Sequence, residues 1–402
     1  MELTDLVSSQ IRDFARGIRR QRGLILVTAG NSLAVVLAAL TWFLLAKLLT
    51  VPEYGRVNYL ASVAILASSV AALGMPATLQ AFLPKGDEYI ASGATLAASA
   101  AGLALGLPLA TLHPTLPLIT LGYALYMVAT SERLGRRDYR GYALLQILSR
   151  IGMLAWILAA VPTLGIDGAL LGFAVTNLVS SAWILRELRS VRRGIASLRE
   201  HFQFSLAALA MAMTSSAVMK FDKVLIGSLY GDETLGYYQL AFQFYAALGV
   251  IPTSLRNYLL PEKSSGRRTR RAELAGMGIS ALAAAAGVTL SPLAIRLLFP
   301  KFYPVSATAA QIASLAVVPG AAFSVWAAGK LSEERPVRVL AVNLVAISVL
   351  VASISLLGKV AGVAGLAASL VIYRSSAAIL AGLTDWARRV GTCGGLTGSP
   401  GS

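Results

Sequence analysis

The sequence predicts an all-α polytopic membrane protein with about twelve transmembrane helices. Its 402 residues are 56% hydrophobic and only 13% charged, with a mean hydropathy of +0.69, whereas soluble domains carry about 25% charged residues. The apolar residues form runs of about twenty, the length of a helix that crosses the hydrocarbon core. Backbone groups within hydrocarbon find no water to bind, so these runs must be helical.

Residues 1–23 precede the first apolar run. Apolar residues such as Leu6, Ile11 and Phe14 recur there at helical spacing among Arg12 and Arg16. This pattern predicts an amphipathic cytoplasmic segment that lies on an anionic membrane surface. A plain basic topology anchor is the alternative interpretation.

Twelve spans follow in order, and the fourth is short. They are expected at Leu24–Ala46, Val57–Phe82, Tyr89–Ala110, Leu116–Thr130, Leu144–Leu164, Ala169–Leu185, Phe204–Leu229, Leu235–Leu260, Leu274–Leu298, Ala307–Ala328, Val337–Leu357 and Val363–Leu383.

Basic residues orient these spans. The N-terminal segment, alternate connections and the C-terminal tail together hold 25 lysines and arginines, with clusters at 133–140, 186–199 and 267–271. The opposite side holds five, which are Lys47, Arg56, Arg296, Lys301 and Lys359. Because cytoplasmic loops are enriched in Lys and Arg, this alternation predicts cytoplasmic N- and C-termini. It also argues against nucleic acid as the reason for the net charge of +16.

An internal repeat divides the spans into two halves. Three short segments recur in the same order in both halves: 53–55 with 234–236, 76–84 with 252–261, and 165–168 with 362–365. Both halves have six spans and begin on the same side, so the repeats are parallel. We therefore expect two pseudo-symmetric six-helix lobes around a central cavity, an N-lobe at 24–200 and a C-lobe at 201–385, with a flexible cytoplasmic tail at 386–402.

Several motifs resemble those of the polysaccharide biosynthesis flippases. They are Gly30-Asn31 in the first span, Thr50-Val-Pro-Glu-Tyr-Gly55 after it, Phe221-Asp222-Lys223 with Gly227, and Leu235-Gly236-Tyr237-Tyr238. The chain is similar over nearly its whole length to the O-antigen-type branch of the multidrug/oligosaccharidyl-lipid/polysaccharide exporter superfamily.

The resemblance implies a function that hydropathy alone does not give. A member of this family moves an oligosaccharide on a polyprenyl-diphosphate carrier across the cell membrane by alternating access. The partners implied are this lipid-linked oligosaccharide, membrane lipids, and glycosyltransferases or a polymerase of the same pathway.

Arg374 is the deepest cation in the predicted spans. A charge at this depth is costly and usually faces a cavity or a partner. Arg374 lies twelve residues after Gly362, and Asn177 lies twelve residues after Gly165, so the repeat makes the two positions equivalent. Polar groups at both predict a cargo-lining face, and a structural interhelical bond is the alternative.

Gln80 and Arg256 form a second equivalent pair, each four residues after a repeat proline. They lie toward the cytoplasmic end, where a cargo phosphate would enter. Arg256 and Arg150 are candidates for the same contact. Both also have the alternative of extending to the inner headgroups.

The outer part of the seventh predicted span contains three charged residues, Lys220, Asp222 and Lys223. Lys220 and Lys223 share a helix face, and Asp222 lies about 100° from Lys223. Asp222 is a candidate for ion coupling or gating, and neutralisation of a lysine through another helix is the alternative. Asn31 is a further candidate for sugar contacts, although most such residues simply bond between helices.

No catalytic residue, metal site or cofactor is predicted. His113 and His201 are the only histidines and lie far apart, and Cys393 is the single cysteine. Acidic residues are few and the loops are short, which disfavours an enzyme. Within the superfamily, a multidrug or small-molecule exporter and a peptidoglycan-precursor flippase remain alternatives, although an acid-poor interior favours an anionic cargo.

Overall fold

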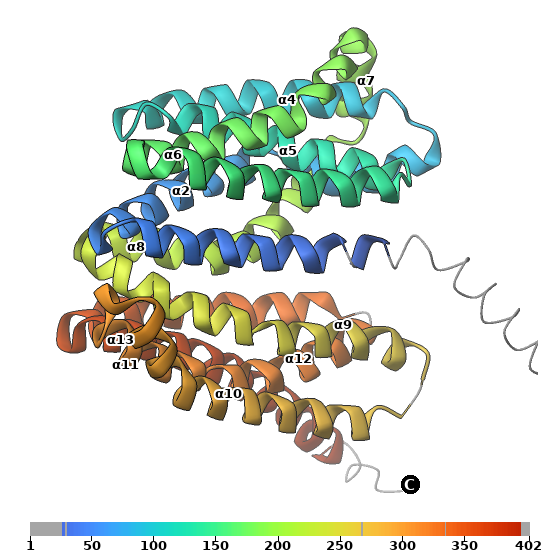
Figure 1. Cartoon of the computed structure of the whole chain (residues 1–402). Helices are drawn as coiled ribbons and strands as arrows, with labels where there is room; N and C mark the ends of the chain where they lie inside the picture. The colour runs from blue at the N-terminus through green and yellow to red at the C-terminus, as the bar shows by residue number, and fades with distance from the viewer. Residues whose placement is uncertain (1–25, 29, 267, 334, 395–402) are drawn as a thin grey trace, which may run out of the picture. The chain divides into compact units, whose positions relative to one another are not determined.

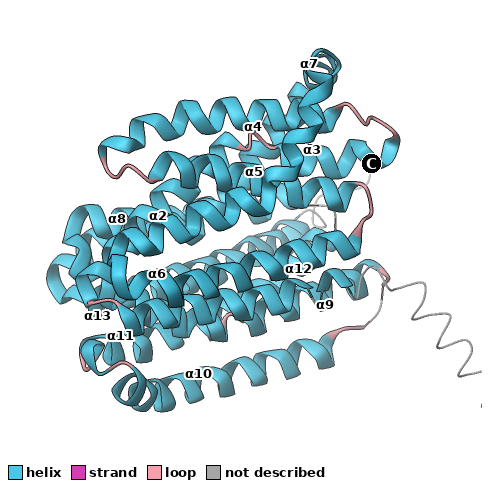
Figure 2. Ribbon diagram, turned by 45° about the horizontal axis from the view of Figure 1, so that its top comes forward, coloured by secondary structure: helices cyan, strands magenta, loops and turns pink. Residues whose placement is uncertain are grey.

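The computed structural model describes residues 26–28, 30–266, 268–333 and 335–394, and these are almost entirely helical, without a strand (Figure 1, Figure 2). The chain divides into two compact units. Unit 1 holds Met1–Leu45 and Leu60–Ser216, and unit 2 holds Ala46–Tyr59 and Ala217–Ser402. The predicted amphipathic segment at 1–23 and the last residues of the tail lie outside the described residues.

The first half of the chain forms a helix at Leu26–Leu48 and then a series of further helices. These are α2 (Val51–Ala71), α3 (Met75–Phe82), η1 (Leu83–Lys85), α4 (Ile90–Gly106), η2 (Leu107–Thr111), α5 (Leu116–Gly135), α6 (Tyr139–Ser181), η3 (Ala182–Ser190) and α7 (Val191–Glu200).

The second half continues with further helices. These are α8 (Phe202–Leu248), α9 (Val250–Ser264), α10 (Arg270–Leu298), η4 (Pro300–Phe302), α11 (Val305–Ser314), α12 (Val317–Ser332) and α13 (Pro336–Gly394). The boundaries between the two units fall inside the helix Leu26–Leu48, inside α2 and inside α8.

Three elements are too long to be one crossing, and each is broken at a glycine. Gly165 interrupts the 43 residues of α6, Gly231 the 47 residues of α8, and Gly362 the 59 residues of α13. All three glycines have positive φ, a conformation that side chains with a Cβ rarely adopt. The breaks fall in connections that the sequence predicts between consecutive spans.

The breaks in α6 and α13 have the same geometry. Gly165 has φ 54° and ψ −125°, and Gly362 has φ 54° and ψ −135°. Three residues later, Gly168 packs against the carbonyl oxygen of Ala160, and Gly365 packs against that of Leu357, in both cases eight residues back. The two turns therefore agree in backbone and packing, which supports the repeat at these positions.

The predicted second span consists of two helices. The α2 and α3 helices are bent by 43° at a short break, where Leu73 and Gly74 both have positive φ. A Cβ at Gly74 would overlap the backbone of Ser205 in α8. The close approach of α8 thus requires glycine at the bend.

The core of unit 1 is built largely of small residues. Where the end of α2 and the helices α3, α4 and α5 pack together, the buried residues include Ala71, Ala94, Ala98, Ala124, Met75, Leu79, Ile90 and Val128. Small side chains let helix backbones approach closely, which is how helices associate in lipid.

By length and composition, six helices in the described part of the chain can cross a membrane, or seven if α2 and α3 form one span. Large apolar side chains such as Leu282, Leu293 and Val360 are exposed on these helices, as expected for surfaces in contact with lipid. The chain is thus an all-α multi-pass membrane protein, and the number of twelve crossings stays a prediction.

Candidate functional site

Arg374 lies in unit 2, in the part of α13 that follows the break at Gly362. Its Nε donates a hydrogen bond to the hydroxyl oxygen of Tyr245 (2.8 Å), and its guanidinium carbon lies 4.9 Å from the centre of the Tyr373 ring. Among the described residues, no carboxylate pairs with it, and no hydrogen bond engages its terminal nitrogens. Arg374 is thus held in place by one edge, and its opposite edge is free to bind an anion.

Asp222 and Lys223 form a buried pair in α8, each 1% exposed. The Lys223 Nζ lies 3.0 Å from both carboxylate oxygens of Asp222. Tyr238 donates to the same carboxylate (2.9 Å), and Lys223 also lies 3.5 Å from the centre of the Phe242 ring.

This pairing adds to the two interpretations drawn from the sequence, which were ion coupling or gating by Asp222 and neutralisation of a lysine through another helix. In the structure Asp222 pairs directly with its neighbour Lys223. Burial drives the two charges together, because an unpaired charge is very costly there. The hydroxyl of Tyr238, from beyond the break in α8, completes the set.

Unit 1 contains a row of hydrogen-bonded polar side chains. Tyr142 donates to the side-chain oxygen of Asn31 (2.7 Å), and the Gln146 amide donates to the Tyr142 hydroxyl (3.0 Å). Tyr126 of α5 in turn donates to the side-chain oxygen of Gln146. The row therefore links the first helix, α5 and α6.

Arg150 extends this row along α6. Tyr142, Gln146 and Arg150 are spaced four residues apart and share one helix face. Arg150 interacts electrostatically with the Tyr126 hydroxyl, and its buried Nε has no hydrogen-bond partner among the described residues. Arg150 in unit 1 and Arg374 in unit 2 thus each interact with a tyrosine hydroxyl.

The other predicted residues lie apart from these groups. Asn177 is buried and donates to the carbonyl oxygen of Phe173 one turn earlier (2.6 Å), a contact within its own helix. Gln80 is exposed and makes a long hydrogen bond to Ser131 (3.4 Å). Arg256 is exposed, and Lys220 is half-buried.

The tyrosines were missing from the predicted set. Tyr126, Tyr142, Tyr238 and Tyr245 are all buried and bond to a predicted polar residue or to its neighbour. The four-residue spacing of Tyr142, Gln146 and Arg150 within an apolar run was a usable signal for the row in unit 1.

Ion pairs link charged residues at the end of α5 in unit 1. Glu132 is buried at the end of α5 and pairs with Arg136, which also reaches Glu187 (3.3 Å). Burial raises the pKa of the Glu132 carboxyl above its ordinary value, although Arg136 and Arg133 oppose this shift.

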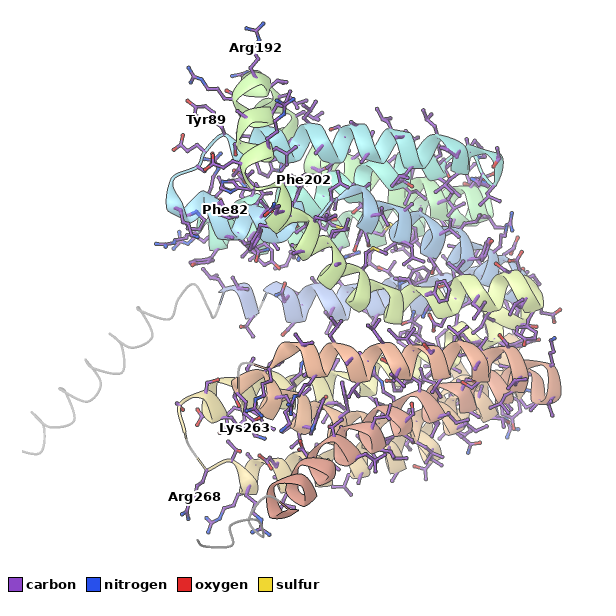
Figure 3. All side chains as sticks on the ribbon, turned by 180° about the vertical axis from the view of Figure 1, so that it is seen from behind. Phe82, Tyr89, Arg192, Phe202, Lys263 and Arg268 are labelled. Carbon is purple, nitrogen blue, oxygen red and sulfur yellow. The ribbon has the colours of Figure 1, made fainter. Side chains whose placement is uncertain are left out.

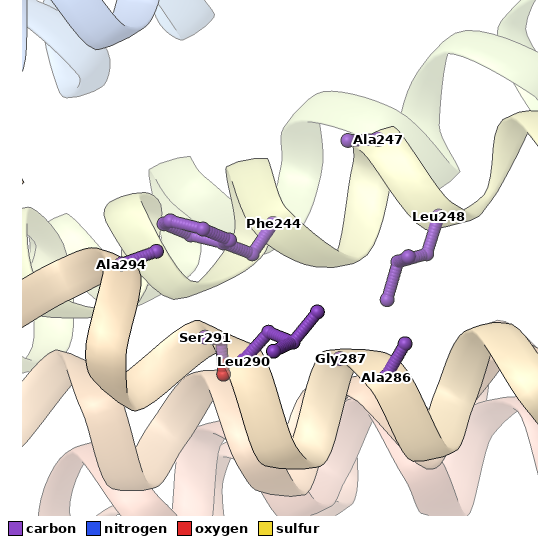
Figure 4. Close-up of a pocket in the computed structure, with 8 residues that line it drawn as sticks. All are labelled: Phe244, Ala247, Leu248, Ala286, Gly287, Leu290, Ser291 and Ala294. Carbon is purple, nitrogen blue, oxygen red and sulfur yellow. The ribbon is translucent and has the colours of Figure 1, made fainter.

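A groove of about 190 Å³ lies between α8 and α10 in unit 2 (Figure 4). It is lined mainly by apolar side chains, among them Phe244, Leu248 and Leu290. Such a lining suits a hydrocarbon chain better than a sugar. Among the described residues, no three His, Cys, Asp or Glu side chains are grouped to hold a metal ion.

The comparisons with known proteins agree with this architecture. Residues 115–295 match the model of a family described as polysaccharide biosynthesis protein. No curated protein sequence matches the chain significantly.

Solved structures share the fold at low sequence identity. The lipid II flippase MurJ, in an inward closed conformation, has a TM-score of 0.72 at 14% identity, over 90% of this chain and 87% of its own. An inward-facing multidrug resistance MATE transporter of the MOP superfamily has a TM-score of 0.63 at 14% identity, over 91% and 96%.

A third structure is a MOP superfamily transporter from Pyrococcus furiosus, described as having a binding pocket of reverse polarity. It has a TM-score of 0.54 at 15% identity, over 90% of this chain and 94% of its own. The chain is therefore similar in sequence to polysaccharide biosynthesis proteins over residues 115–295, and it shares the fold of the MurJ flippase and of MOP superfamily transporters.

Proposed function

We propose that this protein is a flippase that moves a polyprenyl-diphosphate-linked oligosaccharide from the cytoplasmic to the outer leaflet of the cell membrane. In this proposal both termini are cytoplasmic, the lobes at 24–200 and 201–385 alternate access, and the protein is a transporter rather than an enzyme. Glycosyltransferases or a polymerase of the same pathway would supply or use its cargo.

The observation that carries the proposal is the environment of Arg374. Its guanidinium is fixed by Tyr245 and has no carboxylate partner among the described residues. A planar cation with free nitrogens within a membrane-spanning helix is suited to phosphate oxygens, because a guanidinium binds them with two parallel hydrogen bonds. A diphosphate linkage supplies such oxygens.

The polar row of unit 1 suits the sugar part of this cargo. Tyr126, Tyr142, Gln146 and Asn31 offer amide and hydroxyl groups that exchange donors and acceptors with sugar hydroxyls. Arg150 at the end of the row offers a second cation. In this proposal the polar row binds sugar hydroxyls through hydrogen bonds, and Arg150 and Arg374 bind the phosphate charge.

A multidrug exporter is less well supported. A cationic cargo calls for a free carboxylate in its path, and Asp222, the carboxylate that the sequence places within a span, is already bound by Lys223 and Tyr238. A peptidoglycan-precursor flippase has equal support from charge, since that cargo also carries a lipid diphosphate.

Transport in vesicles tests the proposal. The purified protein is reconstituted with a fluorescent polyprenyl-diphosphate oligosaccharide, and a membrane-impermeant quencher reports the lipid in the outer leaflet. We expect the protein to raise the flipping rate, Arg374→Ala to abolish the increase, and Arg374→Lys to restore part of it. No increase over empty vesicles under any ion gradient would contradict the proposal.

A further inference from the structure

The connection between the two halves of the chain contains the short helix α7, which crosses α4. α7 runs crosswise to α4 at the end where α4 begins (Figure 1, Figure 3). At the crossing, Gly194 of α7 packs directly on the backbone of Ser92 and Gly93, and a Cβ on Gly93 would overlap Gly194. This glycine contact brings the two backbones together and fixes the position of α7.

The end of α7 is fixed as well. Ser197 donates to Asp87 (2.6 Å), and His201 lies 3.2 Å from the same carboxylate. The His201 ring stacks on Phe82 with 3.7 Å between ring centres. These contacts hold the end of α7 against the last residue of α3 and the connection before α4, so its free face has a defined direction.

The free face is basic and apolar. Arg192, Ile195, Ala196 and Arg199 are exposed, and Arg192 lies at the outermost part of α7 in Figure 3. At 100° per residue, the two arginines lie within about 20° of each other, beside Ile195. The nearest carboxylate on the helix, Glu200, lies about 100° from Arg199, and Glu187 is bound by Arg136.

The orientation of α7 relative to α4 determines whether the free face of α7 lies at the membrane surface. Since α4 is a membrane span, a helix that crosses its end lies along the membrane surface. A helix there with arginine beside an isoleucine on its free face has the features of interfacial helices that bind anionic lipids. Arg186 and Arg189 of the preceding η3 are also exposed and extend the basic surface.

We propose that α7 binds anionic lipid headgroups, with Arg192 and Arg199 as its main contacts and Ile195 inserted among the upper acyl chains. On the proposed orientation this is the cytoplasmic leaflet. The site is separate from the arginines assigned to the cargo, so it is an anchor for the connection between the halves rather than part of the transport path.

A probe on α7 tests the proposal without a transport assay. Ala196→Cys, in a Cys393→Ser background, is labelled with a fluorescent dye, and the full-length protein is reconstituted in phosphatidylcholine vesicles. Trace amounts of spin-labelled phosphatidylglycerol or spin-labelled phosphatidylcholine then act as quenchers. One arginine near an anionic surface contributes about 1 kcal/mol, so we expect about fivefold stronger quenching by phosphatidylglycerol.

Two double variants separate specific contacts from general charge. Arg192→Ser with Arg199→Ser should remove the preference. Arg268→Ser with Arg270→Ser, which removes two exposed arginines just before α10 and at its first residue, should leave it unchanged. High salt should weaken the preference through screening. Equal quenching by the two lipids, as expected if the face instead binds an acidic protein, would overturn the proposal, as would a preference that survives loss of Arg192 and Arg199.

Discussion

Gly55 of α2 and Gly236 of α8 occupy matching places at one helix crossing in unit 2. A Cβ on Gly55 would collide with the carbonyl oxygen of Asp232, and a Cβ on Gly236 would collide with that of Val51. Each glycine lies four residues after the residue that its counterpart contacts. The sequence repeat aligns these two glycines, and the structure shows them in the same role.

Substitution at this crossing should destabilise the protein. Gly55→Ala and Gly236→Ala force backbone against backbone, and we expect each to cost about 1–3 kcal/mol. Gly278→Ala is the control, because nothing lies within 4 Å of its Cβ position in α10, and there alanine should be neutral or stabilising. The tryptophan fluorescence midpoint of thermal unfolding in detergent measures all three. If the thermal midpoints of Gly55→Ala and Gly236→Ala equal that of the wild type, the helix crossing tolerates an added methyl group.

Variants of the Asp222–Lys223 pair can separate a structural role of the pair from a role of Asp222 in transport. Lys223→Met or Asp222→Asn leaves a buried group without its partner, and we expect each to cost about 3–5 kcal/mol. The double variant removes both charges and should recover most of that loss. If the double variant is as unstable as either single variant, the two side chains are not the coupled pair described above.

Transport by the double variant then decides the role of Asp222. A purely structural pair predicts normal cargo flipping once stability is recovered. Loss of flipping in a stable double variant would instead support the ion-coupling role that the sequence suggested for Asp222.

Stability should depend on pH through Glu132. Burial raises the pKa of this carboxyl above its ordinary value of 4.5, so the folded protein binds the proton more tightly than the unfolded chain. The ionised carboxylate therefore costs stability at neutral pH, and that cost is relieved as pH falls through the raised pKa. Glu132→Gln should show a smaller rise in its thermal midpoint on acidification than the wild type. Glu333→Gln, an exposed carboxyl in the other unit, serves as the control and should keep the wild-type response.

The sequence predicted the fold class well because apolar length and backbone hydrogen bonding leave few options in a membrane. It also located the breaks at Gly165, Gly231 and Gly362 within predicted connections. It did not predict the bend at Gly74, because that bend depends on the approach of Ser205, which is more than a hundred residues away in the chain. Such contacts have no local signature.

The candidate site was less predictable for a related reason. Charged residues such as Arg374 stand out in an apolar run, so the sequence could nominate them. The tyrosines that orient them do not stand out, since tyrosine is common near membrane surfaces. The place of Asn177 in the repeat suggested a cargo contact; its amide donates to a carbonyl of its own helix, and the cargo contact stays a prediction.

Cargo selectivity in one vesicle preparation tests the central claim most directly. The same reconstituted protein is given a fluorescent polyprenyl-diphosphate oligosaccharide and a cationic dye, under identical ion gradients, and the movement of each is followed. We expect the lipid-linked oligosaccharide to reach the opposite leaflet in an Arg374-dependent manner while the dye does not move. Export of the dye with no flipping of the lipid would contradict the assignment of an anionic, lipid-linked cargo.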